Sequence, residues 1–405
     1  MRAVLRGAVV VACVLAWTDV AWGQLPDGPY VAAGGRISVG GEIAATASPP
    51  DDAYFNYTDY DHHALRNVRG RILGEWRAAA RLSVLGELRI ENRDSIEAAA
   101  LYLRWRPWAT RTFSVQVGRI PPVIGSYARH AYGRDNLVIG LPLAYQYLTS
   151  LRPDAIPATS DDLLRMRGRG WRSSFSFGDR TPANGIALVT ATRWATGAQA
   201  QWRVGRMEFA GAVTNGSPAV VPSFRTFDHL MWSGRAGVTA APGLTVGVSA
   251  ARGQWLDKAL VAAVPEALRR QRAQSVVGVD LEFGLSRVLV RAEWLRSAFE
   301  VPVLGHPVLE SPLVAEAGFI EGRYRWHPRW QTSARFERLA FSDIQGTLFA
   351  GMPTPWDAPV IRVETALGYR VARNLEIRAG WQYNHRHGGR VTTRSYPALQ
   401  VLYWY

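Results

Sequence analysis

Arginine and glutamate residues recur at every second position along many segments of this sequence. In residues 68–77, for example, Arg69, Arg71, Glu75 and Arg77 occupy odd positions, whereas the even positions are apolar or glycine. Side chains two residues apart on a β-strand point to the same face, so these charges would share one face. Fixed charges along a face attract ions of the opposite sign and select among dissolved solutes. The spacing therefore predicts an ion-attracting surface built from strands.

The candidates for this surface are arginines of the charged parity, joined by arginines and tyrosines of one long connection. Lysine and arginine together number 47 against 33 acidic residues, and the net charge of +14 predicts a surface that favours anions. Glutamates share the charged parity, so Arg and Glu on neighbouring strands could instead neutralise one another. Arginine and tyrosine together would suit anionic or ring-shaped solutes. The pore-lining candidates are Arg104, Arg129, Arg134, Arg235, Arg291, Arg323, Arg335, Arg362, Tyr127 and Tyr132.

The elements that must position these residues are predicted to be β-strands about ten residues long, enough to cross a membrane when tilted. The parity opposite the charges is apolar in many segments, as at Leu82, Val84 and Leu88. We predict an all-β fold, a transmembrane antiparallel β-barrel of 18 strands. Sixteen is the alternative, because only Ala195 and Thr196 separate two of the segments. The segments are 34–45, 67–78, 81–91, 96–106, 111–119, 170–178, 184–194, 197–204, 206–214, 230–240, 244–253, 274–283, 287–297, 315–326, 329–339, 359–371, 375–385 and 394–405.

The connections between these segments alternate between short and long. Those on one side are tight turns, such as 79–80 and 372–374, whereas those on the other side are usually long, such as 46–66 and 298–314. This alternation predicts the short periplasmic turns and long external loops of a bacterial outer-membrane barrel. The longest connection is 120–169, and a connection of this length is often a solvated surface loop.

Both ends of the sequence carry signals for export and assembly. Arg2 and Arg6 precede an apolar run, and residues 1–23 are predicted to be a secretory signal peptide cleaved after Gly23. Residues 24–405 would then form the barrel without any cysteine, because Cys13 is the only one, which excludes disulfides and thiolate sites. The final segment has one apolar face that ends on an aromatic residue. The residues of that face are Leu399, Val401, Tyr403 and Tyr405.

Together these features resemble the outer-membrane porins of Gram-negative bacteria, in particular the substrate-selective porins with 16 to 18 strands. Residues 118–125 are similar to a Gly-basic-x-x-Pro-x-x-Gly stretch that ends a strand in many of these proteins. The resemblance implies that the barrel-insertion machinery reads the apolar carboxyl-terminal face, with Tyr405 in place of the usual Phe. It also implies that the connection 120–169 folds into the barrel and narrows it, with a solvated surface loop as the alternative. The implied function is a channel for passive diffusion of small hydrophilic solutes, with anions favoured by the charge.

The sequence also bears on partners and on other classes of function. The implied surroundings are outer-membrane lipid and lipopolysaccharide, and assembly with identical chains is left open. Nucleic acid is not expected, because the basic residues are spread along strands without a binding motif. No nucleophile stands beside a histidine and no metal-ligand spacing occurs, so no enzyme, catalytic residue, metal or cofactor is expected. The alternatives are a structural or adhesive barrel without channel activity, and a transporter or exporter of a larger polyanionic substrate.

Overall fold

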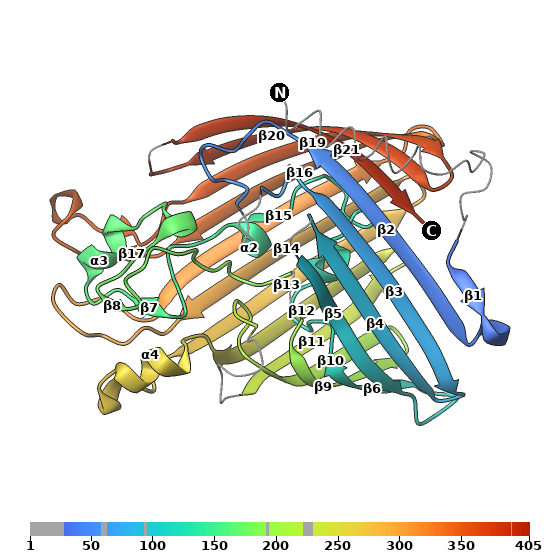
Figure 1. The fold of residues 1–405 in the computed structure, drawn as a ribbon, viewed down its shortest axis with the longest axis horizontal. Helices are drawn as coiled ribbons and strands as arrows, with labels where there is room; N and C mark the ends of the chain where they lie inside the picture. Colours follow the sequence, from blue (N-terminus) through green and yellow to red (C-terminus); the bar gives the residue numbers. More distant parts are fainter. Residues whose placement is uncertain (1–27, 58–62, 93–94, 192–193, 222–229, 390) are drawn as a thin grey trace.

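The protein is an all-β molecule built around one closed sheet (Figure 1). The computed structural model describes residues 28–57, 63–92, 95–191, 194–221, 230–389 and 391–405. Within these residues, sixteen strands form an antiparallel barrel that closes because the last strand, β21, pairs with β2. Closure leaves no open sheet edge, as a strand array in hydrocarbon requires. The predicted signal peptide, residues 1–23, lies outside the described residues.

Most barrel strands are nine to thirteen residues long, in keeping with tilted strands that cross a bilayer. A short strand, β1 (Tyr30–Ala32), precedes the barrel. The barrel strands are β2 (Ile37–Ala47), β3 (Val68–Ala79), β4 (Leu82–Glu91), β5 (Ser95–Trp105), β6 (Thr112–Arg119), β9 (Thr196–Val204), β10 (Met207–Asn215), β11 (Leu230–Ala241), β12 (Leu244–Gln254), β13 (Ala273–Leu285), β14 (Val288–Phe299), β15 (Leu313–Tyr324), β16 (Trp330–Phe341), β19 (Val360–Ala372), β20 (Leu375–Arg386) and β21 (Thr393–Trp404).

The predicted count of 18 strands is wrong, and the alternative of 16 is confirmed. The segments 170–178 and 184–194 do not enter the barrel, because β6 pairs directly with β9 from Arg119↔Thr196 onward. Both segments belong instead to the connection between these two strands, where they pack against backbone. A Cβ on Gly170 or Gly185 would lie only 1.9 or 1.7 Å from a carbonyl oxygen of residues 148–149. Burial inside the barrel produced an alternation that the sequence alone could not distinguish from a strand.

The two faces of each strand differ in burial as the parity of the sequence predicts. In β16, Gln331, Ser333, Arg335 and Glu337 are buried, whereas the intervening residues, such as Phe336, are exposed. The charged parity therefore faces the lumen and the apolar parity faces outward. An apolar outer face is what contact with lipid requires.

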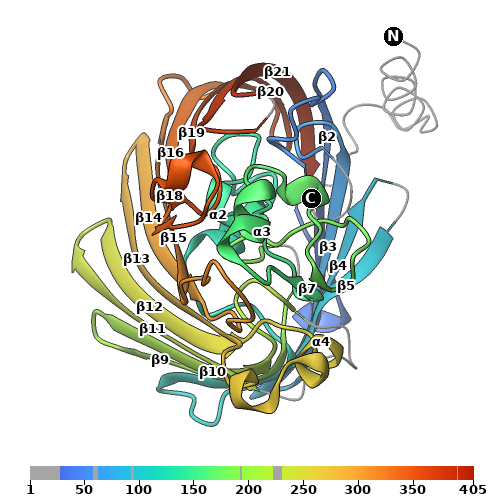
Figure 2. The same cartoon turned by 90° about the vertical axis from the view of Figure 1, so that its left-hand side faces the viewer.

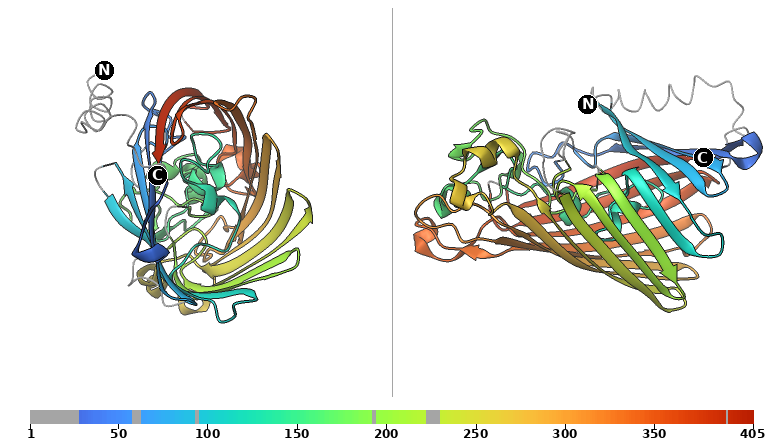
Figure 3. Two further views of the ribbon diagram at one scale, coloured as in Figure 1. Left: turned by 90° about the vertical axis from the view of Figure 1, so that its right-hand side faces the viewer. Right: turned by 90° about the horizontal axis from the view of Figure 1, so that it is seen from below.

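The two ends of the barrel differ in the length of their connections. At one end, which we call the short-turn end, the strands are joined by brief turns, for example between β11 and β12. The N-terminal β1 and the C-terminus lie at this end, and β1 continues the line of β21 by pairing with β2 at Ile37–Val39 (Figure 3). At the opposite, long-connection end lie the α4 helix (Lys258–Ala263) and the two-residue strands β17 (Asp343–Ile344) and β18 (Thr354–Pro355) (Figure 1). No helix in the described part of the chain is long and apolar enough to cross a membrane.

Candidate functional site

The connection between β6 and β9, residues 120–195, folds into the barrel, and we call it the inward loop. Part of it lies inside the ring of strands, and part lies at the long-connection mouth of the barrel (Figures 1 and 2). The loop is longer than the predicted 120–169 because it includes the segments 170–178 and 184–194, which the sequence predicts as strands. Its elements are the short helices η2 (Tyr127–His130), α2 (Leu143–Gln146), α3 (Ser160–Arg165) and η3 (Gly170–Arg172) and the strands β7 (Ala155–Ile156) and β8 (Phe177–Gly178).

Two glycines mark the point where the chain leaves the wall and turns inward. Gly118 has a φ of +130° and Gly125 a φ of +66°, conformations that L residues with a Cβ rarely adopt. A Cβ on Gly118 would lie 2.4 Å from the Leu101 carbonyl oxygen, so the position also needs a small residue. The Gly125 N–H then donates to the Ser249 Oγ at 3.1 Å on β12, across the lumen. The motif at 118–125 therefore encodes the entry of the inward loop.

Lumen-facing carboxylates hold the backbone of the inward loop. The Oε2 of Glu293 accepts from the Ser126 N–H at 2.6 Å and the Tyr127 N–H at 3.2 Å, and its Oε1 accepts from the Tyr145 hydroxyl. Glu364 and Glu337 repeat this arrangement on β19 and β16. The Glu364 Oε1 accepts from the N–H groups of residues 139 and 140 at 3.0 and 2.7 Å, and the Glu337 Oε2 from that of residue 143 at 2.5 Å. Hydrogen bonds to charged groups are worth about 1.5–3 kcal/mol each, so these carboxylates act as anchors.

Lumen-facing arginines hold the same loop through its carbonyl oxygens. Arg335 donates to the carbonyl of residue 140 at 2.8 Å, and Arg362 to that of residue 141 at 3.1 Å. Arg378 donates to the carbonyls of residues 133 and 136, each at 2.9 Å. Arg335 also forms ion pairs with Glu337 of its own strand at 2.9 Å and with Glu364 of β19 at 3.2 Å. This part of the wall therefore presents both glutamates, which accept from N–H groups of the loop, and arginines, which donate to its carbonyl oxygens.

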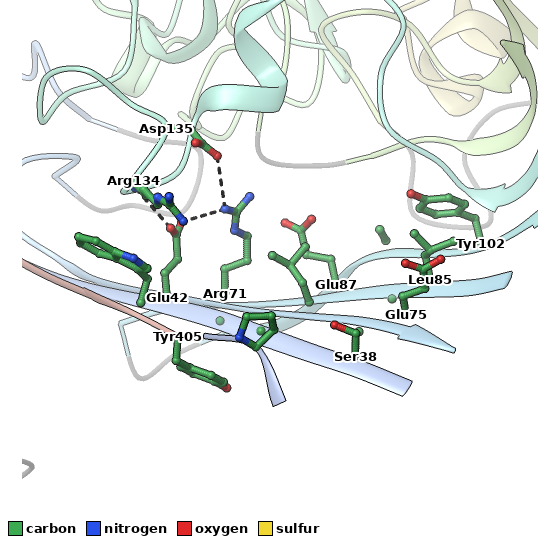
Figure 4. A pocket seen from close by; sticks show the side chains of 18 of the residues that line it. Ser38, Glu42, Arg71, Glu75, Leu85, Glu87, Tyr102, Arg134, Asp135 and Tyr405 are labelled. Atoms are coloured by element: carbon green, nitrogen blue, oxygen red, sulfur yellow. Dashed lines mark hydrogen bonds and ion pairs between the residues drawn. The ribbon is translucent and has the colours of Figure 1, made fainter. Parts of the chain in front are cut away.

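Water-accessible space remains between the inward loop and the wall at the short-turn end. The first cavity there, of about 450 Å³, lies against β2 to β5 (Figure 4). Figure 4 shows Arg71 between Glu42 and Asp135, with N–O distances of 3.2 and 3.9 Å. Two further acids of this cavity are also paired, Glu75 and Glu87. Their partners are Arg104 at 2.7 Å and Arg89 at 2.6 Å.

Two smaller cavities accompany the first. The second cavity, of about 240 Å³, also lies at the short-turn end, between Arg129 of the inward loop and the strands β6 and β9 to β11. The third, of about 230 Å³, lies within the loops, where residues 184–187 meet 219–221. The loop thus fills part of the lumen and leaves cavities beside it.

The predicted pore-lining residues fall into three groups in the structure. Arg291, Arg335, Arg362 and Tyr127 are buried against the inward loop or the wall beneath it. Arg104 and Arg235 form ion pairs within the wall, the latter with Glu208 and Asp280. The third group is mixed: Tyr132 is buried, Arg323 is half-buried, and Arg129 and Arg134 are exposed at the second and first cavities.

The anchoring carboxylates Glu293, Glu337 and Glu364 were not singled out from the sequence. Their parity places them on the lumen face, and that was the available signal. Their role as acceptors for loop N–H groups depends on the path of the inward loop, and its sequence has no regular alternation of polar and apolar residues from which that path could be predicted. The sequence therefore predicts the lumen face correctly, but it predicts contact with solute where the structure shows contact with the backbone of the inward loop.

The apolar carboxyl-terminal face lies where the sequence predicts it. Leu399 is exposed on the outer face of β21, and Val401 and Tyr403 share its parity. The side chain of Tyr405 covers Gly41 of β2, where an added Cβ would lie 3.0 Å from the tyrosine ring. The Gly41 N–H also donates to the Tyr405 carbonyl oxygen at 3.2 Å. The strand that carries this face, β21, closes the barrel by pairing with β2. Recognition of the face by the insertion machinery stays a prediction.

A histidine of the inward loop makes loop docking sensitive to acid. Burial, followed by the charge of Arg291, lowers the pKa of His130 to about 4, against the opposing effects of Glu282 and Asp135 and with Arg129 adding to the lowering. In a released loop, His130 would have its ordinary pKa of about 6.5 and would be protonated below that pH, whereas in the docked loop it stays neutral down to about pH 4. Docking of the loop therefore weakens as the pH falls from about 6.5 to 4. We expect conductance fluctuations in planar bilayers to increase over this window. The variant His130→Asn should lack that increase, and an equal increase in the variant would contradict the assignment.

The fold and its charged lumen together define a porin-like β-barrel. No family model matches the sequence, and no curated protein does. Among solved structures, OmpT of Vibrio cholerae is similar, with a TM-score of 0.54 and 11% identity over 93% of this chain and 100% of that one. The outer membrane channel DcaP of Acinetobacter baumannii also has a TM-score of 0.54, with 10% identity over 93% of this chain and 100% of that one. OmpF of Salmonella typhi, in a complex with daunomycin, has a TM-score of 0.52, with 10% identity over 91% and 97%. At these identities the likeness shows the fold.

Proposed function

We propose that this protein is an outer-membrane channel for passive diffusion of small hydrophilic solutes. The observation that carries the proposal is a closed barrel with a charged lumen, in which the inward loop leaves cavities of about 450, 240 and 230 Å³. A barrel of this width is too large for wall side chains alone to fill. The similarity of its fold to DcaP, described as an outer membrane channel, supports the same function. Contact with outer-membrane lipid and lipopolysaccharide, and assembly with identical chains, belong to this proposal.

Recordings in planar lipid bilayers test the proposal. Purified protein should produce discrete current steps, and their size should be small for a 16-stranded barrel because the inward loop occupies much of the lumen. A protein that inserts and folds but gives no steps would instead support a structural or adhesive barrel. Heat-dependent migration on gels provides the folding control, because a folded barrel and an unfolded chain migrate differently.

We further propose that the channel favours anions, because several arginines of the lumen face have no acidic partner among the described residues. The acids of the first cavity all have arginine partners. By contrast, Arg323 and Arg370 form no ion pair among the described residues, and both are half-buried. The strongest charge effects on Arg323 come from three arginines, Arg325, Arg291 and Arg378, followed by one acid, Glu376. An excess of positive charge beside a water-filled path raises the local concentration of anions.

Replacing Arg323 and Arg370 by glutamine should shift selectivity toward cations. A lost charge about 8 Å from a passing ion is worth about 0.5–1 kcal/mol in a water-rich lumen, roughly a two- to fivefold change in relative permeability. The measurement is the reversal potential in a potassium chloride gradient. The matched control is Arg296→Gln, because Arg296 is exposed on the outer face, where it pairs with Glu316 at 3.7 Å. A wild-type potential of cationic sign would overturn the anion preference while leaving the channel intact.

A further inference from the structure

We propose that the second cavity is a binding site for a small oxyanion, a carboxylate or a phosphate, centred on Arg129. The inference deepens the proposed function and rests on it for the route by which solute reaches the cavity. The side chains that line the cavity include three arginines, a glutamate and three neutral groups that form hydrogen bonds. They are Arg129, Arg203, Arg235, Glu208, Thr112, Ser114 and Gln201.

The backbone that carries Arg129 is held in place by an anchor of the inward loop. Arg129 belongs to η2, and the two residues that begin this turn, Ser126 and Tyr127, donate their N–H groups to Glu293. Tyr127 is 1% exposed and packs edge-on against Phe319, with ring centroids 5.6 Å apart. The turn is therefore fixed at its start. A guanidinium on a fixed backbone loses less entropy when it binds a ligand.

Among the described residues, the charges around the cavity leave Arg129 without an ion-pair partner. Arg235 is committed to Asp280, at 2.5 Å, and to Glu208. Arg203 lies 3.4 Å from the same Glu208. Arg129 makes no hydrogen bond or ion pair within the described residues, so three guanidinium groups face two carboxylates. One positive charge remains for an anion.

The surroundings of Arg129 disfavour a bare cation. The Arg129 side chain is exposed to the lumen, with Arg235, Glu208 and Asp280 among the charged groups close enough to act on it. Desolvation, followed by the positive charge of Arg235, lowers the pKa of Arg129. A bound anion would relieve both effects, because it replaces lost hydration and offsets the neighbouring charge. Guanidinium groups bind carboxylate and phosphate oxygens in pairs, which suits either oxyanion.

Neutral polar groups continue the site along the wall. In the β6–β9 register, Thr112 faces Arg203, Ser114 faces Gln201, and Gln116 faces Gln199. Among the described residues, both the amide nitrogen and the amide oxygen of Gln199 are buried without a hydrogen-bond partner.

Buried amides normally find partners, so this column has unused capacity for hydrogen bonds beside the cavity. The cavity volume of about 240 Å³ is sufficient for an oxyanion of modest size.

Thermal unfolding of the detergent-solubilised, full-length protein tests the site without requiring a channel. Sodium acetate and sodium phosphate are titrated against sodium chloride at constant ionic strength. We expect a saturable rise in Tm with acetate or phosphate that chloride does not reproduce, and the more effective anion identifies the ligand chemistry. The variant Arg129→Gln should weaken the apparent affinity roughly ten- to hundredfold, as expected for loss of a charged hydrogen-bond donor. Arg129→Lys should retain part of it.

The matched control is Arg296→Gln, an arginine that is exposed on the outer face of β14, where it pairs with Glu316 at 3.7 Å. This variant should bind acetate or phosphate as the wild type does. Equal Tm shifts with all three salts, or equal affinities for wild type and Arg129→Gln, would overturn the site. Oxyanion binding by a protein that gives no current steps would support the site and contradict the channel. Current steps from a protein that binds no oxyanion would support the channel and contradict the site.

Discussion

Replacement of Glu293 by alanine should release the start of the inward loop and raise single-channel conductance several-fold. Glu293 accepts hydrogen bonds from two backbone N–H groups and from the hydroxyls of Ser126 and Tyr145. Each such bond to a charged acceptor is worth about 1.5–3 kcal/mol, and their loss leaves buried donors without partners. A loop freed at this anchor should sample positions away from the wall. We therefore expect larger and noisier current steps in planar bilayers.

Two further variants separate the anchor from a general effect of removing a charge. Glu293→Gln keeps the shape and one acceptor oxygen, so its conductance should lie between those of wild type and Glu293→Ala. Glu316→Ala removes an acid from the outer face of the neighbouring strand β15, where Glu316 is exposed and pairs with Arg296. It should leave the conductance unchanged. If Glu293→Ala gave wild-type steps, the loop would be held by its other contacts alone, and the anchor assignment would fail.

The class of fold could be predicted from the sequence because membrane strands obey a simple physical rule. Contact with hydrocarbon on one face and with a polar lumen on the other forces an alternation of period two. That alternation placed the charged face inward in β16 and β19, as the burial of Arg335, Glu337, Arg362 and Glu364 shows. The strand count was less secure, since chain packed inside a lumen also alternates between buried and less buried positions.

The partners of the lumen charges could not be predicted, because they depend on register and on the loop. Arg335 pairs with Glu321 and Glu364, which lie 14 and 29 residues away on the two neighbouring strands. A shift of two residues in either register would exchange these partners while preserving parity. The inward loop then adds acceptors and donors of its own. Three of the arginines that the sequence predicts to line the pore, Arg291, Arg335 and Arg362, instead donate to carbonyl oxygens of the loop.

The cluster around Arg335 illustrates how strongly this wall depends on matched charge. Arg335 is 1% exposed and lies within 3.3 Å of an oxygen of each of three acids, Glu321, Glu337 and Glu364. It also donates to the carbonyl of residue 140 in the inward loop. Removing one member of a buried ionic cluster costs about 3–5 kcal/mol, because the remaining charges stay desolvated and unpaired. Arg335→Leu should therefore lower the thermal unfolding temperature more than any outward-facing substitution.

Matched variants distinguish lost charge from lost volume at this position. Arg338→Leu changes the next arginine along β16, which is exposed on the outer face, and should leave the unfolding temperature close to that of wild type. Arg335→Lys retains the charge but lacks the planar fork that reaches several oxygens at once, so an intermediate loss is expected. Adding Glu321→Gln and Glu364→Gln to Arg335→Leu should recover much of the stability, because amides are cheaper to bury than unpaired carboxylates. If these additions recovered nothing, the loss would come from packing rather than from charge, and the wall would not depend on its ionic cluster.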